Sequence, residues 1–166
     1  TTELLLGMPE DAAVKLSVLR VTNHSRHRRR LALTAFVEWT LGTRRELTQH
    51  QVYTRYVAED GAILAKNHFD LAFTEWTSFL AISEPVTSHS ADRLSFIGQD
   101  GSLEDPAALR MAQLDGVTGV QHDPCGALQM QMSLAPGEMR EVVVLLGAAR
   151  TERDLSLIHI SEPTRL

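Results

Sequence analysis

Apolar and polar residues alternate along several segments of the chain, and this pattern predicts β-strands. From Leu31 to Leu41 every odd position is apolar, while the even positions include Thr34, Glu38 and Thr40. A period of two places one apolar face against a core, so this segment is expected to form a half-buried strand. Eleven residues at about 3.3 Å each span roughly 36 Å, which favours a large sheet over a small barrel.

The same alternation returns near the end of the chain, at Leu128, Met130, Met132 and Leu134, with Gln129, Gln131 and Ser133 on the opposite face. The segment 135–138 (Ala-Pro-Gly-Glu) then supplies turn geometry. A Val-rich run from Glu141 to Leu146 follows, and it is expected to be buried on both sides. The two strands are predicted to pair as a hairpin.

Another hairpin is predicted by 51–57 and 62–66, which flank the turn signal Asp60-Gly61. A strand over 14–21 is joined to Leu31 through a polar segment that begins at Asn23.

Only residues 105–110 read as helical, with Asp105 as N-cap and Pro106 at the first helical position. Long antiparallel strands without alternating helices predict an all-β fold of two large packed antiparallel sheets.

Composition bounds the class of protein. The chain has 166 residues, 43% of them hydrophobic, which is enough for one ordinary domain. A formal charge of −5 argues against a nucleic-acid partner, because such proteins concentrate Lys and Arg on one face. No apolar stretch approaches the roughly 18 to 20 residues of a spanning helix. The lone Cys125 fits a reducing, cytoplasmic compartment.

Both ends look like cuts in a longer protein. Thr1 is not Met and leads at once into three leucines, as if a strand were entered midway. Residues 155–166 (LSLIHISEPTRL) continue no earlier pattern and resemble a translated sequencing-adapter tail. We therefore expect a β-sandwich domain over 1–154 and a non-native tail over 155–166.

Sequence motifs give little support to catalysis or metal binding. The seven histidines match no ligand spacing on one element: His24, His27, His50, His68, His89, His122 and His159. No nucleophile or nucleotide-binding motif is present, so no catalytic residue and no metal ligand is predicted. The basic run 25–30 (SRHRRR) could hold phosphate or an acidic partner, but a solvated hairpin turn is the favoured interpretation.

Carboxylates and aromatic side chains are the residue types that could bind a sugar. Glu38, Asp100 and Glu104 are interpreted as ordinary solvated carboxylates. Trp39 lies on the apolar parity of its strand and is expected in the core. Trp76 and Phe69, among the remaining aromatics, could form a platform for a sugar ring, although core or interface packing is the favoured interpretation.

Four groups of residues, in order, resemble a known family. They are Val37 to Gly42 (VEWTLG) with Arg45-Glu46 and His50; Ala65-Lys66-Asn67 before Phe73 and Phe79; Asp92 to Gly98 (DRLSFIG) with Gly101-Ser102-Leu103 and Pro106 to Leu109; and Asp123 to Gln129 with Leu134 to Glu138. This order is similar to the N-terminal sandwich domain of the cellobiose phosphorylase and cyclic β-1,2-glucan synthase family. The third group is the most specific match.

The resemblance implies a galactose mutarotase-like super-sandwich, followed in the family by a linker helix and an (α/α)6 barrel. That barrel performs inverting phosphorolysis with inorganic phosphate as co-substrate, and it supplies the general acid, so no residue of this chain inherits a catalytic role. The implied partners are the chain's own missing catalytic domain and a β-glucan or glucooligosaccharide, without a cofactor. The implied location is cytoplasmic, including on the cytoplasmic side of an inner-membrane parent.

The loop from Phe96 to Leu109 is the predicted site of sugar contact, with Gln99, Asp100, Ser102 and Arg93 as candidates. Phe96 and Leu109 are expected to anchor its ends in the sandwich, and a tight structural loop without sugar contact is an equal alternative. Gln99-Asp100 departs from the Arg-Asn of the family, which weakens any anion-binding role of the loop. The main hypothesis is an accessory domain that shapes the entrance to the barrel. The alternatives are an independent sugar-binding module, which would use Trp76 and Phe69, and a structural sandwich that supports a homodimer.

Overall fold

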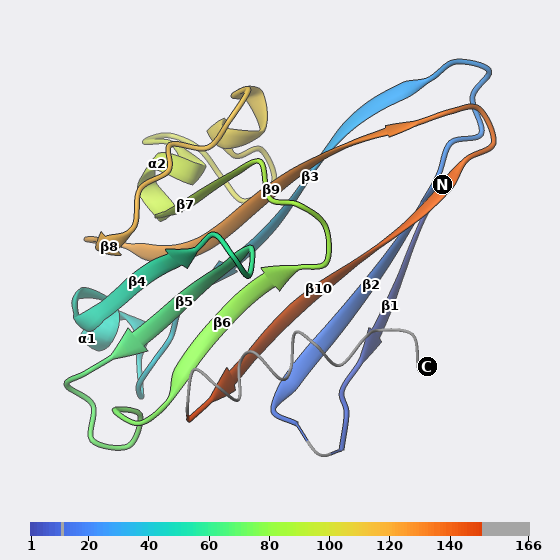
Figure 1. Cartoon of the computed structure of the whole chain (residues 1–166). Coiled ribbons are helices and arrows are strands. Elements are labelled where there is room, and N and C mark those ends of the chain that lie inside the picture. The colour runs from blue at the N-terminus through green and yellow to red at the C-terminus, as the bar shows by residue number, and fades with distance from the viewer. Residues whose placement is uncertain (11, 151–166) are drawn as a thin grey trace.

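A computed structural model describes residues 1–10 and 12–150 as two antiparallel β-sheets packed face to face (Figure 1). The larger sheet has seven strands in the order β1-β2-β10-β6-β5-β4-β8. Their bounds are β1 Thr2–Gly7, β2 Val14–Thr22, β4 Val52–Val57, β5 Ala62–Asn67, β6 Thr77–Ile82, β8 Gly119–Val120 and β10 Met139–Ala149. The smaller sheet has the order β3-β9-β7, with bounds β3 Arg29–Glu38, β7 Ser88–Asp92 and β9 Pro124–Leu134. The expected all-β, two-sheet fold is confirmed.

The core lies between the two sheets. Apolar residues from the inner faces of both sheets form it: Val21, Ala35, Trp39, Val52, Ile63, Ala65, Leu80, Ile82, Leu128, Met130, Met132, Leu134 and Val142. Trp39 is 3% exposed, as predicted from its place among the alternating apolar positions. It packs so tightly on β9 that a Cβ at Gly126 would lie 2.7 Å from its ring. This strand position therefore requires glycine.

The predicted strand over 31–41 is confirmed with a shifted range. β3 begins at Arg29 and ends at Glu38, so Trp39 and Leu41 follow the strand. The 51–57 and 62–66 segments pair as the predicted hairpin, with Val52 opposite Asn67 and Val57 opposite Ala62.

The predicted hairpin of 128–134 with 141–146 is wrong, although both strands exist. β9 pairs with β3 and β7, whereas β10 pairs with β2 and β6 in the other sheet. The turn at Pro136 and Gly137 thus carries the chain from one sheet to the other. Alternation places one face of each strand in the core, but strands from two facing sheets share that property, so the pattern does not select the partner.

The basic run 25–30 is a second connection of this kind. It leads from β2 in the large sheet to β3 in the small sheet, so the hairpin turn expected there is also wrong. Arg29 and Arg30 belong to β3 itself.

The outer face of β9 is covered as well. Cys125 and Ala127 pack there with Phe96, Ile97, Ala108 and Leu114 in a second apolar cluster. Gln129, predicted on the face opposite the apolar residues, is 2% exposed, and its side-chain oxygen accepts a hydrogen bond from Ser88 Oγ at 3.1 Å. Both faces of β9 are therefore buried at these positions, although the alternation predicts only one buried face.

The described residues contain four short helical segments, and three were not predicted. They are α1 Arg45–Thr48, the 3-10 turn Gln49–Gln51 and α2 Arg93–Ile97. The fourth is a 3-10 turn at Ala107–Arg110, which confirms the 105–110 prediction in part: Pro106, rather than Asp105, occupies the N-cap. No helix in the described residues is long and apolar enough to cross a bilayer. The predicted tail 155–166 lies outside the described residues.

Candidate functional site

The candidate site is a long excursion of the chain from the small sheet, residues 93–118 between β7 and β8, which we call the β7–β8 excursion. It starts with α2, whose N-cap Asp92 accepts a hydrogen bond from Leu94 N at 2.9 Å. Gly98 ends the helix with a φ of 90°, a conformation that favours glycine. The short capped helix α2 therefore redirects the chain away from the small sheet.

Apolar anchors hold the excursion against β9. Phe96 is buried and stacks on Phe36 of β3, with ring centroids 4.5 Å apart. Leu114 is buried in the same cluster, and its N–H donates to Ser88 Oγ at 3.0 Å. Leu109, expected to anchor the far end of the loop, is 59% exposed, because the neighbouring Ala108 takes the buried position. The excursion is thus a folded layer with a core of its own.

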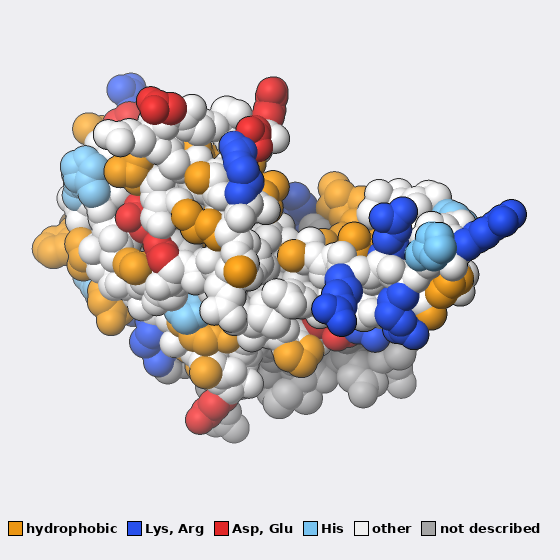
Figure 2. Space-filling model, turned by 90° about the horizontal axis from the view of Figure 1, so that it is seen from above, with side chains coloured by type: hydrophobic (Ala, Val, Ile, Leu, Met, Phe, Trp, Pro, Cys, Tyr) orange, Lys and Arg blue, Asp and Glu red, His pale blue; other side chains and the backbone are white. Residues whose placement is uncertain are grey.

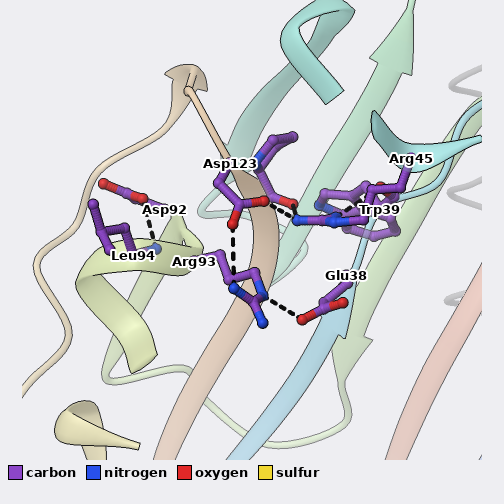
Figure 3. Close-up of polar contacts among 8 residues, drawn as sticks. Glu38, Trp39, Arg45, Asp92, Arg93, Leu94 and Asp123 are labelled. Atoms are coloured by element: carbon purple, nitrogen blue, oxygen red, sulfur yellow. Dashed lines mark hydrogen bonds and ion pairs between the residues drawn. The ribbon is translucent and has the colours of Figure 1, made fainter. Parts of the chain in front are cut away.

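An ion-pair network ties the start of the excursion to the sandwich (Figure 3). Arg93 lies between two carboxylates: its Nε donates to Glu38, and its Nη1 is 3.3 Å from Asp123 Oδ2. Its backbone N–H also donates to Asp123 O at 2.9 Å. The hydrogen bond to Glu38, with smaller contributions from the charges of both carboxylates, raises the pKa of Arg93. The guanidinium is therefore held by the fold.

Arg45 completes this network from the other side of Asp123. Its Nη2 donates to Asp123 Oδ1, and Nη1 donates to the Trp39 carbonyl at 3.2 Å (Figure 3). The side chains of the two ion pairs of Asp123 are 18 to 32% exposed. Such partly desolvated pairs fix geometry more firmly than fully exposed ones, which are worth little.

Residues from separate sequence motifs meet at this point. Glu38 and Trp39 come from the VEW segment, Arg45 from the RE pair, Arg93 from DRLSFIG, and Asp123 from the segment that opens β9. All of these residues lie in the family motifs, but the sequence alone predicts a solvated Glu38 and indicates no role for Arg45 or Asp123. The only signal was their presence in motifs of the same family.

The other predicted sugar-contact residues lie together at the outer turn of the excursion. Gln99, Asp100 and Ser102 are all exposed, and none of them touches the network that holds Arg93. Gly101 packs against α2, since a Cβ there would lie 1.9 Å from Ile97 O. A hydrogen bond from Asp105 N to Ser102 Oγ at 3.3 Å closes the turn. The structure therefore separates Arg93 from the other three candidates.

The aromatic alternative lies on the β5–β6 connection, away from the β7–β8 excursion (Figure 1). Phe69 is 74% exposed on a turn ordered by buried Asn67, whose Oδ1 accepts hydrogen bonds from Phe69 N and Asp70 N. Trp76 is half-buried, and the guanidinium of Arg150 lies 5.2 Å from its ring centre. One ring face of Trp76 thus already contacts a cation.

Titratable groups elsewhere in the described residues do not form a reactive or metal-binding site. Burial raises the pKa of the Cys125 thiol, and the charges of Asp92 and Asp123 raise it further, which disfavours a reactive thiolate. His50 and His122 lie with ring centroids 4.6 Å apart. Within residues 1–10 and 12–150, no group of three or more His, Cys, Asp or Glu side chains is arranged to hold a metal ion.

The comparisons with known proteins agree with this architecture. Residues 1–159 match the family model "Glycosyl hydrolase 94, supersandwich domain". The chain is 29% identical over 136 residues to the cyclic beta-(1,2)-glucan synthase NdvB of Rhizobium meliloti (81% of this chain, 5% of the relative). It is 29% identical over 149 residues to the solabiose phosphorylase of Paenibacillus borealis (86% and 19%), and 24% identical over 161 residues to the cellobionic acid phosphorylase of Neurospora crassa (92% and 20%). The chain thus spans a fifth or less of each relative.

Proposed function

Because the chain belongs to the glycosyl hydrolase 94 supersandwich domain family, we propose that it is a non-catalytic accessory domain of a carbohydrate-active enzyme. In this proposal it packs on an (α/α)6 catalytic barrel of the same polypeptide and shapes the entrance to the active site. The parent transfers glucosyl groups or cleaves β-glucan by inverting phosphorolysis, with inorganic phosphate as co-substrate. This domain binds no cofactor of its own and faces the cytoplasm.

One observation carries the proposal: the β7–β8 excursion is held on the sandwich by a buried apolar cluster, and it also exposes large apolar side chains to solvent. Four large apolar side chains on the β7–β8 excursion are about half exposed or more: Leu94, Leu103, Leu109 and Met111. Figure 2 shows hydrophobic side chains on the surface of this wide lobe. Exposed apolar groups gathered on an ordered surface mark an interface more often than a solvated face. The greater length of the relatives supports a further domain as the partner.

The polar turn beside these apolar groups suits the entrance role. Gln99, Asp100 and Ser102 bring an amide, a carboxylate and a hydroxyl into one exposed turn. Such groups hydrogen-bond to sugar hydroxyls, and a carboxylate does so most strongly. If the apolar surface docks on a barrel, this turn lies at the rim of the contact, where a glucan chain would pass.

The first test uses the full polypeptide that contains this domain. Leu94→Asp with Leu109→Asp should weaken docking and raise KM for long glucooligosaccharides, whereas Leu5→Asp on β1 serves as a matched control. Unchanged kinetics in the double variant, with an unchanged domain arrangement by small-angle scattering, would refute the docking role. The 166-residue chain alone should release no glucose 1-phosphate from β-glucan in phosphate buffer.

A second candidate function, an independent sugar-binding module, is favoured by the exposed ring of Phe69 on its ordered turn. Titration of the isotope-labelled chain with β-1,2-glucooligosaccharides separates the two. Amide shifts confined to Gln99, Asp100 and Ser102, with weak affinity, are expected for the entrance role. Shifts centred on Phe69 and Trp76, lost in Phe69→Ala, would instead favour the binding module.

A further inference from the structure

The end of the sandwich opposite the excursion carries an unusual concentration of positive charge. Two connections meet there, residues 23–28 between β2 and β3 and residues 135–138 between β9 and β10, and we call them with Arg29 and Arg30 the basic tip. Its exposed side chains include four arginines, Arg26, Arg28, Arg29 and Arg30, and two histidines, His24 and His27. Figure 2 shows Lys and Arg side chains gathered on this narrow end.

The basic tip is an ordered structure. Asn23 is 6% exposed, and its Nδ2 donates to the carbonyls of His27, Leu134 and Ala135 at 2.9 to 3.0 Å. Its Oδ1 accepts hydrogen bonds from both the N–H and the hydroxyl of Ser25. One buried amide therefore joins both connections, and the arginines project from a fixed frame.

These arginines have no carboxylate partners in the described part of the chain. Arg28 reaches Ser133 Oγ at 3.4 Å and Arg29 reaches Ser25 Oγ at 3.3 Å, which are contacts to neutral hydroxyls. The two nearby carboxylates have other partners: Glu138, within the tip, accepts a hydrogen bond from Ala135 N, and Glu141 pairs with Arg20. The tip thus carries four arginines and one carboxylate, Glu138, and none of these arginines forms an ion pair within the described residues.

We propose that the basic tip binds the anionic surface of a lipid bilayer. The tip is narrow, and successive residues Arg29 and Arg30 of β3 point to opposite faces of the strand. Charges directed to both sides suit a layer of phosphates that surrounds the tip better than a single flat protein face. Leu31 and Met139, at the adjoining ends of β3 and β10, are also exposed and can reach the acyl boundary.

The acidic net charge of the chain does not prevent this contact. β3 has ten residues, so its far end lies roughly 30 Å from the tip at about 3.3 Å per residue. The Debye length is about 8 Å at physiological ionic strength. The carboxylates of the β7–β8 excursion are therefore screened from a surface that touches the tip.

The test measures binding of the 166-residue chain to phosphatidylcholine vesicles with and without about one third phosphatidylglycerol. We expect binding only to the anionic vesicles, and weaker binding as salt rises. Each arginine near an anionic surface contributes roughly fivefold in partitioning, so R26Q/R28Q/R30Q should bind about a hundredfold more weakly. The matched variant R44Q/K66Q/R110Q, which has the same net charge, should bind like the parent chain.

Two controls keep the test decisive. R26K/R28K/R30K preserves the charges and should retain most of the binding, and thermal unfolding checks that every variant is folded. No binding to anionic vesicles, or equal loss in both triple glutamine variants, would overturn the proposal. Competition by soluble polyglutamate as effective as that by vesicles of equal charge would assign the tip to an acidic protein partner and overturn it too.

Discussion

The two ends of the sandwich differ in whether their arginines are paired with carboxylates. At the end that carries the β7–β8 excursion, Arg45 and Arg93 share Asp123, and Arg93 also binds Glu38. At the basic tip, Arg26, Arg28, Arg29 and Arg30 project from an ordered frame without a carboxylate partner in the described residues. Opposite charges from distant segments stabilise a fold when they pair. Like charges that have no partner within the fold can instead attract an oppositely charged partner outside it.

The largest expected effect concerns the apolar support under the network end. Trp39→Ala should lower the free energy of unfolding by roughly 3 to 5 kcal/mol, because it empties a large buried site against Gly126. Urea denaturation measures this change, and Trp76→Ala, at a half-buried ring, is the control with a smaller expected effect. A loss below about 1 kcal/mol for Trp39→Ala would show that the network end does not depend on this core contact.

The second-largest change in the free energy of unfolding is expected for the ion-pair network of Arg93. Arg93→Ala should cost about 1 to 3 kcal/mol, since it leaves Glu38 without its partner and removes one contact of Asp123. A double-mutant cycle with Glu38→Gln should show a coupling energy of at least about 0.5 kcal/mol. Additive effects of the two substitutions would mean that this pair is no more than a surface contact, and the contrast with the tip would weaken.

A pH dependence should appear where the excursion crosses β7. His89 stacks on Tyr56 with ring centroids 3.9 Å apart, and burial lowers the pKa of His89 below its ordinary 6.5. The unfolded chain then binds a proton more readily than the folded chain, so stability is lost as pH falls from about 6.5 through the lowered pKa. Thermal unfolding between pH 7 and 5 should show this loss, and His89→Gln should flatten it. An identical slope in the variant would rule out His89 as the cause.

The smallest effect is expected at the tip. R26Q/R28Q/R30Q should change the free energy of unfolding by no more than about 0.5 kcal/mol, because these exposed side chains form no ion pair that the fold uses. Asn23→Ala should destabilise the same tip much more, since the buried amide makes five hydrogen bonds. Chemical denaturation distinguishes the two. A large loss in the arginine variant would show that its charges serve the fold rather than a partner.

The candidate site was only partly predictable. The motif order pointed to the region of Arg93 and to the turn of Gln99, Asp100 and Ser102, and the structure places that turn on the surface. It did not reveal that Arg93 is held by Glu38 and Asp123, residues 55 and 30 positions away in the chain. A side chain's charge is visible in a sequence, but its partner depends on how distant segments pack.

Alternation and motif order identified many of the strands, their core-facing sides and the family, but not β6 or β7. The period of two in β3 and β9 follows from the geometry of any strand with one face in a core, and it correctly placed Trp39 and Leu128 inside. Three features follow from the three-dimensional packing alone: β9 and β10 join different sheets, Gln129 is buried, and Arg93 is paired. The difference arises because alternation depends on each residue and its neighbours along one strand, whereas sheet partners and ion pairs depend on contacts between segments far apart in the chain.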